Sequence, residues 1–345
     1  MGLNIFKYVG WRNWAVFYYN SVFENIFVFF YIALCQSDLS SGFFLKIILF
    51  LVFSVFSTTY GYLINDYADR ELDKAHGKSN TFAGDSAKKA LAVVVLFLIV
   101  SLIAAYPFWN NPLFWLTWLI WLSATSFYSL PPVRFKERGR IGLILVVLAQ
   151  RVLPLILIFV SFRFDRMLDA LLLLIYILLR GASSDINHQL EDYDKDLATA
   201  TQTSVVQMGI RRSQKLFLIV LSLERVAFLF ILTLIALQFG NFTVKGFALF
   251  WLPLALYVVL WFSALVQRGR VQAEDFEGRN PYNRRKNIYQ VIHLVFPNII
   301  LPAFFIFYIL LNNPLYGFFI LFFIFIYRLY DLNTLRNSFF KKWIS

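Results

Sequence analysis

The stretch Asn65-Asp66-Tyr67-Ala68-Asp69-Arg70-Glu71-Leu72-Asp73 directly follows an apolar segment, residues 42–64. On a helix that advances about 100° per residue, Asp66, Asp69 and Asp73 lie within about 60° of one another, so their carboxylates share one face. Such carboxylates repel one another at a membrane edge unless a cation lies among them. A hard divalent ion such as Mg²⁺, held by carboxylates and by substrate phosphates, meets that need. The stretch therefore predicts a helix that leaves a membrane and carries magnesium ligands.

The composition supports the membrane. The 345 residues are 59% hydrophobic and only 15% charged, with a mean hydropathy of +0.65. Runs of about 20 mostly apolar residues are long enough to cross a bilayer as helices. We expect an all-α fold, a polytopic transmembrane helical bundle of nine or ten spans with two similar halves, forming a single domain over residues 1–345. The expected spans are 14–35, 43–65, 89–108, 112–129, 141–162, 168–186, 215–238, 246–266, 288–311 and 314–331.

The positions of the basic residues predict on which side of the membrane each expected loop lies. Most of the 32 Lys and Arg residues lie in the expected loops that share one side of the membrane with the N-terminus. Because cytoplasmic loops carry an excess of Lys and Arg, we expect the N-terminus and these loops to be cytoplasmic, in the inner membrane of a bacterium. The net charge of +12 then reflects topology and attraction to membrane lipid, and we expect no nucleic-acid partner.

A second acidic run, residues 184–196, follows four expected spans after the first, so both runs face the same side. If the sixth span continues as a helix past Asp185, then Asp185, Asp192 and Asp196 lie within about 40° of one another, and Asp194 points to the opposite face. The predicted metal ligands are accordingly Asp66, Asp69, Asp73, Asp185, Asp192 and Asp196. His188 flanks the second group and either bonds to a ligand or serves as an ordinary structural hydrogen-bonder.

Basic loops alternate with the acidic ones. One spans Tyr128 to Arg138, and the other spans Arg268 to Lys286. We expect the four loops to gather over one mouth of the bundle, where Mg²⁺ joins the carboxylates to a diphosphate and basic side chains neutralise its remaining oxygens. The plainer explanation of Arg134, Arg138 and the second basic loop is that they only set the topology.

The chain resembles the UbiA superfamily of intramembrane prenyltransferases in three motifs. Asn65-Asp66-x-x-Asp69-x-x-x-Asp73 is similar to the first aspartate-rich motif of that family, and Asp192-x-x-x-Asp196 to the second. Tyr128-Ser-x-Pro-Pro-x-Arg-x-Lys136 is similar to the loop between them, and the resemblance runs over about residues 10 to 310. Many members have Arg-Pro shortly after the first motif, where this chain reads Lys78-Ser79-Asn80-Thr81-Phe82.

The resemblance implies Mg²⁺-dependent transfer of an isoprenyl group from a prenyl diphosphate to a hydrophobic acceptor within the membrane. The acceptor is expected to be an aromatic or quinone precursor or another lipid-soluble nucleophile. By the same resemblance Tyr128 and Lys136 touch the diphosphate, and the two acidic motifs hold the metal and the diphosphate. The residues expected to be catalytic are Asp66, Asp69, Asp192 and Lys136, and those expected to bind the diphosphate are Asn65, Tyr128, Arg134, Lys136 and Arg138.

Two other classes of protein compete with this interpretation. A transporter would use charged residues inside the spans, and the expected spans hold Glu24, Arg151, Arg180, Glu224 and Arg225. A transporter nevertheless predicts acidic residues near the bilayer midplane, whereas the acidic runs here lie at span ends. A phosphotransferase that acts on CDP-alcohols also has an aspartate-rich metal site, but the Asp-Gly start of its motif is absent here.

The topology predicts the labelling of single cysteines introduced in a Cys35→Ser background. Cysteines at Ser79, Glu137 and Thr199 should react with a membrane-impermeant thiol reagent only after cells are permeabilised, because all three lie in the expected cytoplasmic loops. A cysteine at Asn241 should react in intact cells. Labelling of positions 79 and 199 from opposite sides would contradict a shared mouth for the two acidic runs.

Overall fold

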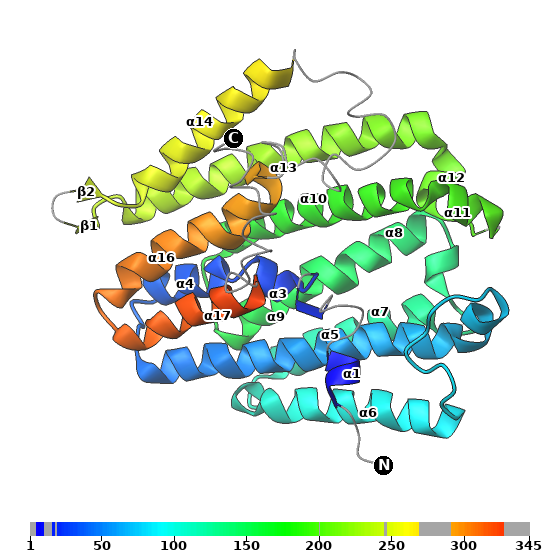
Figure 1. The fold of residues 1–345 in the computed structure, drawn as a ribbon. Coiled ribbons are helices and arrows are strands. Elements are labelled where there is room, and N and C mark those ends of the chain that lie inside the picture. Colours follow the sequence, from blue (N-terminus) through cyan, green and yellow to red (C-terminus); the bar gives the residue numbers. More distant parts are fainter. Residues whose placement is uncertain are drawn as a thin grey trace. The chain divides into compact units, whose positions relative to one another are not determined.

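The computed structural model describes residues 5–9, 16–17, 19–199, 201–244, 247–268 and 291–327. Its described part is helical, except for the two-residue strands β1 (Thr243–Val244) and β2 (Phe247–Ala248), which pair antiparallel. Figure 1 shows the helices in chain order. They are α1 (Ile5–Val9), α3 (Ser21–Glu24), α4 (Phe27–Cys35), α5 (Ser41–Ala75), α6 (Ala87–Ala104), η1 (Tyr106–Phe108), α7 (Pro112–Ser129), η2 (Phe135–Glu137), α8 (Arg140–Val147), η3 (Leu148–Val152), α9 (Leu153–Ser161), α10 (Met167–Glu191), α11 (Tyr193–Ala198), α12 (Ser204–Met208), α13 (Ile210–Phe239), α14 (Trp251–Arg268), η5 (Val291–Ile300), α16 (Leu301–Leu310), η6 (Pro314–Gly317) and α17 (Phe318–Ile326).

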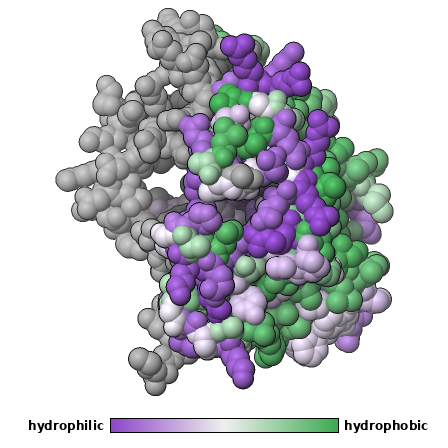
Figure 2. Space-filling view, turned by 90° about the vertical axis from the view of Figure 1, so that its right-hand side faces the viewer, coloured by the Kyte–Doolittle hydropathy of each residue, from purple (hydrophilic) through white to green (hydrophobic). Residues whose placement is uncertain are grey.

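The chain is an integral membrane protein. Six helical segments of the described residues are long and apolar enough to cross a bilayer: 41–75, 87–104, 140–161, 167–191, 210–239 and 291–310. Two shorter apolar helices, 251–266 and 314–326, add to them. Figure 2 shows hydrophilic residues over the middle of the face that it draws and hydrophobic residues along its right-hand edge. The six segments confirm a polytopic helical protein, and the prediction of nine or ten spans stays a prediction.

The first expected span, 14–35, is broken in its described part. A turn at residues 25–26 separates α3 from α4. Asn20 Oδ1 accepts hydrogen bonds from the Val22 amide at 3.0 Å and from the Ser54 hydroxyl at 2.9 Å. An asparagine that bonds to nearby backbone competes with helix formation, which explains why a continuous helix does not start earlier. The nine residues of α4 are too few to cross the hydrocarbon alone.

The chain forms two compact units. Unit 1 contains residues 1–23, 45–165 and 196–207, and unit 2 contains residues 24–44, 166–195 and 208–345. Two similar halves, as predicted from the loops, would each be one continuous part of the chain. The observed units differ, because residues 24–44 belong to unit 2 and residues 196–207 belong to unit 1. In unit 1, α5 packs on α6 through Phe56 and Phe97, whose ring centroids are 5.5 Å apart. It also packs on α7 through Phe53 and Phe114, at 5.7 Å.

A buried polar cluster joins four helical elements of unit 2. Arg180 on α10 donates to Tyr176 Oη at 2.7 Å and to Asn298 Oδ1 of η5 at 2.8 Å, and its Nη2 lies 3.5 Å from Glu24 Oε2 of α3. Arg180 is 1% exposed and Glu24 is 6% exposed. A charge at this depth is costly unless it is paired, so the Glu24 carboxylate offsets the charge of Arg180.

The cluster continues on the same face of α10. Ser183 donates to Glu224 Oε2 of α13 at 2.6 Å. The other oxygen of Glu224 lies 2.5 Å from His293 Nδ1 of η5. Glu24, Arg180 and Glu224 are therefore each engaged with neighbouring polar side chains.

We predict that Arg180→Met lowers the free energy of unfolding by about 3–5 kcal/mol, because it leaves a buried glutamate without its cation. Denaturant unfolding in detergent measures the change. Lys215→Met is the matched control, because Lys215 is exposed on α13 of the same unit and should change stability little. Equal losses in the two variants would contradict the structural role of the cluster.

Candidate active site

The first acidic motif occupies the last turns of α5. This helix runs without a break through 35 residues, so the predicted helix beyond the apolar segment is confirmed. Asp66 is fully buried, and its Oδ2 accepts a hydrogen bond from the Thr81 hydroxyl at 2.6 Å and one from the Thr81 amide at 3.2 Å. Asp73 Oδ2 accepts from Asn80 Nδ2 at 2.8 Å. The loop that follows α5 thus folds back onto the motif.

Asp69 meets the basic loop of unit 1. Its carboxylate pairs with Lys136 and lies 3.1 Å from Arg134 Nη2. The three side chains are between 14% and 18% exposed. Burial is the main reason why the pKa of Lys136 is lowered, and the neighbouring Asp69 carboxylate opposes that shift. The loop therefore delivers two cations to one partly buried carboxylate, in a place where charge interactions are stronger than in water.

Asn65 links the two segments further. Its Oδ1 accepts hydrogen bonds from Ser129 Oγ at 2.8 Å and from Lys136 Nζ at 3.0 Å. Ser129 is 1% exposed and ends α7. Lys136 is consequently held between an amide oxygen and a carboxylate. This arrangement presents an ammonium group at the edge of the acidic motif.

The shape of the basic loop depends on two residues with positive φ. Arg134 has φ of +41°, and Gly139 has φ of +54°. The Gly139 amide donates to the Gln202 carbonyl at 2.9 Å, and a Cβ at Gly139 would lie 2.1 Å from Gln207 Oε1. Residues 196–207, which begin with the last aspartate of the second acidic motif, thus pack against the end of the basic loop within unit 1.

The second acidic motif is divided between two helices. Asp185 lies within α10, Asp192 caps its C-terminus, and Asp196 lies on α11. The expected uninterrupted helix is therefore wrong beyond Glu191, and the angular relation that grouped Asp196 with Asp185 and Asp192 does not hold. The Asp192 carboxylate lies 3.3 Å from Lys195 Nζ and 3.8 Å from His188 Nε2.

Other predicted residues have different surroundings. Arg138 donates to the Val133 carbonyl at 2.8 Å and lies over the Phe135 ring at 5.5 Å, so it braces its own loop. Tyr128 is half-buried near the end of α7. The loop Arg268 to Lys286 lies outside the described residues, except for the end of α14. Asn80, Thr81 and Ser129 were not assigned to the site from the sequence, although Ser129 stands in a quoted motif and Asn80 and Thr81 stand in the quoted stretch Lys78 to Phe82.

The oxygen donors at the end of α5 suit magnesium. Carboxylate and amide oxygens are the ligands that this hard ion prefers. Within the described ranges, however, no three acidic, histidine or cysteine side chains lie close enough together to form a ready-made metal site. Hydrogen bonds and ion pairs hold Asp66, Asp69 and Asp73 individually. A bound cation would therefore have to exchange some of these contacts for its own.

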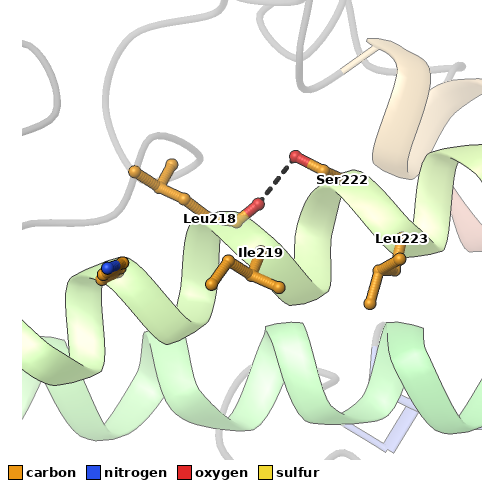
Figure 3. Close-up of a pocket in the computed structure, with 5 residues that line it drawn as sticks. Leu218, Ile219, Ser222 and Leu223 are labelled. Carbon is orange, nitrogen blue, oxygen red and sulfur yellow. Dashed lines mark hydrogen bonds between the residues drawn. The ribbon is translucent and has the colours of Figure 1, made fainter.

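A shallow groove of about 340 Å³ lies along α13 in unit 2. Figure 3 shows the residues that line it: Lys215, Leu218, Ile219, Ser222 and Leu223. Ser222 donates to the Leu218 carbonyl at 2.8 Å. Because all five residues come from one helix and the serine bonds to its own backbone, the groove adds nothing to the candidate site.

Comparisons with known proteins agree with the motifs. Residues 26–277 match the model of the UbiA prenyltransferase family. A UbiA homologue from Archaeoglobus fulgidus bound to GPP and Mg²⁺ is similar in structure, with a TM-score of 0.58 and 16% identity over 88% of this chain and 98% of that chain. The same homologue bound to DMAPP and Mg²⁺ gives 0.57 and 15% over the same shares of the two chains.

A structure of digeranylgeranylglyceryl phosphate synthase is also similar, with a TM-score of 0.51 and 16% identity over 85% of this chain and 98% of that chain. No curated protein sequence matches the chain. At these low identities the solved structures show the fold alone. The match to the family model over residues 26–277 is what shows the family.

We predict that Asp69 and Lys136 are energetically coupled. A double-mutant cycle of Asp69→Asn and Lys136→Met should give an interaction free energy of about 1–3 kcal/mol in denaturant unfolding, because the pair is mostly shielded from water. The control cycle uses Arg70→Met and Glu71→Gln on the same helix. Glu71 is 75% exposed, so its coupling should be near zero. Independent effects of the two changes at Asp69 and Lys136 would contradict the pairing.

Proposed function

Because the chain belongs to the UbiA prenyltransferase family, we propose that it uses Mg²⁺ to transfer an isoprenyl group from a prenyl diphosphate to a hydrophobic acceptor in the membrane. The observation that carries the proposal is the contact of Asp69 with Lys136 and Arg134, because it joins the first acidic motif to the basic loop. The Archaeoglobus homologue, which binds GPP or DMAPP with Mg²⁺, supports the choice of donor and cofactor.

In this proposal the acidic residues hold the cation. Asp66, Asp69 and Asp73 at the end of α5 are the ligands of the first motif, and Asp185, Asp192 and Asp196 are those of the second. Mg²⁺ supplies positive charge that stabilises the diphosphate as it leaves. Within unit 1, the contact of residues 196–207 with the basic loop supports the inclusion of Asp196, because the same loop reaches Asp69.

The basic loop receives the diphosphate. Lys136 and Arg134 already lie at the acidic motif, and Asn65 holds the ammonium group of Lys136 in place. When the diphosphate binds, these two side chains pair with its phosphate oxygens in place of the Asp69 carboxylate. Stabilisation of the leaving group by such preorganised charges is the largest expected contribution to rate. Tyr128 is proposed to contact the diphosphate, and Arg138 acts by bracing the loop.

The acceptor captures the allylic carbon as the bond to the diphosphate oxygen breaks, and the acceptor loses a proton. Exclusion of water protects the carbocation-like carbon from hydrolysis. We propose an aromatic or quinone precursor, or another lipid-soluble nucleophile, as the acceptor. The loops face the cytoplasm of a bacterial cell, so that a soluble diphosphate enters from that side while its chain lies among lipids and apolar side chains.

The alternative of a transporter is not favoured. The charged residues inside unit 2 that motivated it, Glu24, Arg180 and Glu224, are engaged with neighbouring side chains. The acidic residues of the family motif stand at the end of α5, beyond its apolar part.

The direct test incubates the purified protein with Mg²⁺, radiolabelled prenyl diphosphates of several lengths and a cell lipid extract. We expect diphosphate release and one labelled lipid product with at least one donor. Chelation of the metal should abolish both signals. Product formation in excess chelator, or no release with any donor, would overturn the proposal.

Variants of the motifs test the assignment of residues. Asp66→Ala, Asp69→Ala and Asp192→Ala should each lower turnover at least 100-fold, because each removes a carboxylate from the proposed metal site (about 2.7 kcal/mol at the transition state). Asp194→Ala is the matched control, since Asp194 is exposed on α11 and is not a proposed ligand. An equal loss in the control would show that the division of roles in the second motif is wrong.

A further inference from the structure

The loop after α5 is tightly built around the first acidic motif. The Lys78 amide donates to the Asp73 carbonyl at 2.8 Å, and Gly77 allows the turn with a φ of +63°. Phe82 then enters the core of unit 1, where it is fully buried and its ring centroid lies 6.1 Å from that of Tyr8. A loop anchored in this way at both ends holds the two residues that precede Phe82 in one place.

Asn80 uses both ends of its side chain. Its Nδ2 donates to the Asp66 carbonyl and to Asp73 Oδ2, at 2.8 Å each. Its Oδ1 accepts from the Phe82 amide at 2.9 Å. The amide side chain therefore connects two positions of α5 that are seven residues apart, and the anchored Phe82 fixes its orientation.

Thr81 donates two hydrogen bonds to Asp66. Its hydroxyl and its backbone amide both donate to the same oxygen, Oδ2. Two donors on one oxygen fix the rotation of a carboxylate, which otherwise has a broad torsional range. The turn itself does not require the hydroxyl, because backbone bonds from Ala83 to the Asn80 carbonyl at 3.1 Å and from Asp85 to the Phe82 carbonyl at 3.0 Å already close it.

We propose that Asn80 and Thr81 are positioning residues for the divalent cation, and that they set the carboxylates of Asp73 and Asp66 in the orientation in which these bind it. The inference rests on the proposed function. Groups that hydrogen-bond to metal-binding carboxylates orient them and raise affinity, and their loss typically weakens metal binding roughly 10–100-fold.

The test measures Mn²⁺ binding by electron paramagnetic resonance, in purified protein without a prenyl substrate. Thr81→Val keeps the shape and the amide donor but removes the hydroxyl donor, and we expect it to raise the Mn²⁺ dissociation constant roughly 10-fold or more. Thr81→Ser should restore binding to near the wild-type value. Asn80→Ala should weaken binding in the same direction. Thr233→Val is the matched control, because the Thr233 hydroxyl only bonds to the Leu229 carbonyl of its own helix.

Two further measurements separate positioning from simple loss of structure. The thermal midpoint in chelator should be nearly the same for Thr81→Val and Thr81→Ser, while their Mn²⁺ affinities differ. In the assay, Thr81→Val should raise the Mg²⁺ concentration that gives half-maximal rate and leave the rate at saturating Mg²⁺ within a few fold. An unchanged Mn²⁺ dissociation constant in Thr81→Val, or tighter binding, would overturn the inference.

Failure of the inference differs from failure of the proposed function. If Asp66→Asn abolishes Mn²⁺ binding while Thr81→Val does not affect it, the metal site stands and the positioning role is wrong. If the wild-type protein binds no Mn²⁺, or if Asp66→Asn binds it normally, the proposed metal site itself is wrong and the inference is overturned with it.

Discussion

The contact of Asp69 with Lys136 and Arg134 is the interaction on which the arrangement of the site depends. It joins the end of α5 to a loop about 65 positions further along the chain, which Asn65 also contacts through Lys136. The pairing also lowers the free-energy cost of burying these charges, because neither the carboxylate nor the ammonium group is left buried alone. A diphosphate that replaces Asp69 as partner of the cations would enter a region whose charges and hydrogen-bond donors are already in place. The same contact therefore serves folding in the free protein and recognition in the proposed complex.

The buried charges of unit 2 form a polar network inside the protein. Arg180 bonds to the neutral groups of Tyr176 and Asn298 and pairs with Glu24, while Glu224 accepts from Ser183 and lies beside His293. The network fixes the rotation of α10, which carries Asp185 and is followed by its C-cap residue, Asp192. On a helix, Arg180 and Ser183 lie on one face while Asp185 and Asp192 lie about 120–140° around the axis from Arg180. The polar network thus anchors one face of α10 while the proposed ligands occupy another.

Much of this arrangement could be predicted from the sequence, because it rests on local patterns. The apolar run before Asn65 and the spacing of Asp66, Asp69 and Asp73 predicted a helix that continues beyond the membrane edge, and α5 has that form. The prediction failed where contacts distant in sequence decide the structure. Asn20 bonds to Ser54, 34 residues away, and the first expected span is broken there. No glycine or proline marks the end of α10 at Glu191, so the break in the second motif had no local signal. The roles of Asn80 and Thr81 depend on a loop whose path is set by the burial of Phe82.

The length of α5 sets the depth in the membrane at which the proposed reaction would take place. At about 1.5 Å per residue the apolar stretch 42–64 covers roughly the 30 Å of a hydrocarbon core, and Asp66 follows only about 3 Å beyond its last residue. The carbon that changes partners in prenyl transfer is bonded directly to a diphosphate oxygen, so it lies at the same height as the groups that hold the diphosphate. Bond exchange would then take place where hydrocarbon gives way to headgroups. An acceptor suited to that depth is an amphiphile, with its nucleophilic end among the headgroups and its apolar body below, rather than a molecule dissolved in the middle of the bilayer.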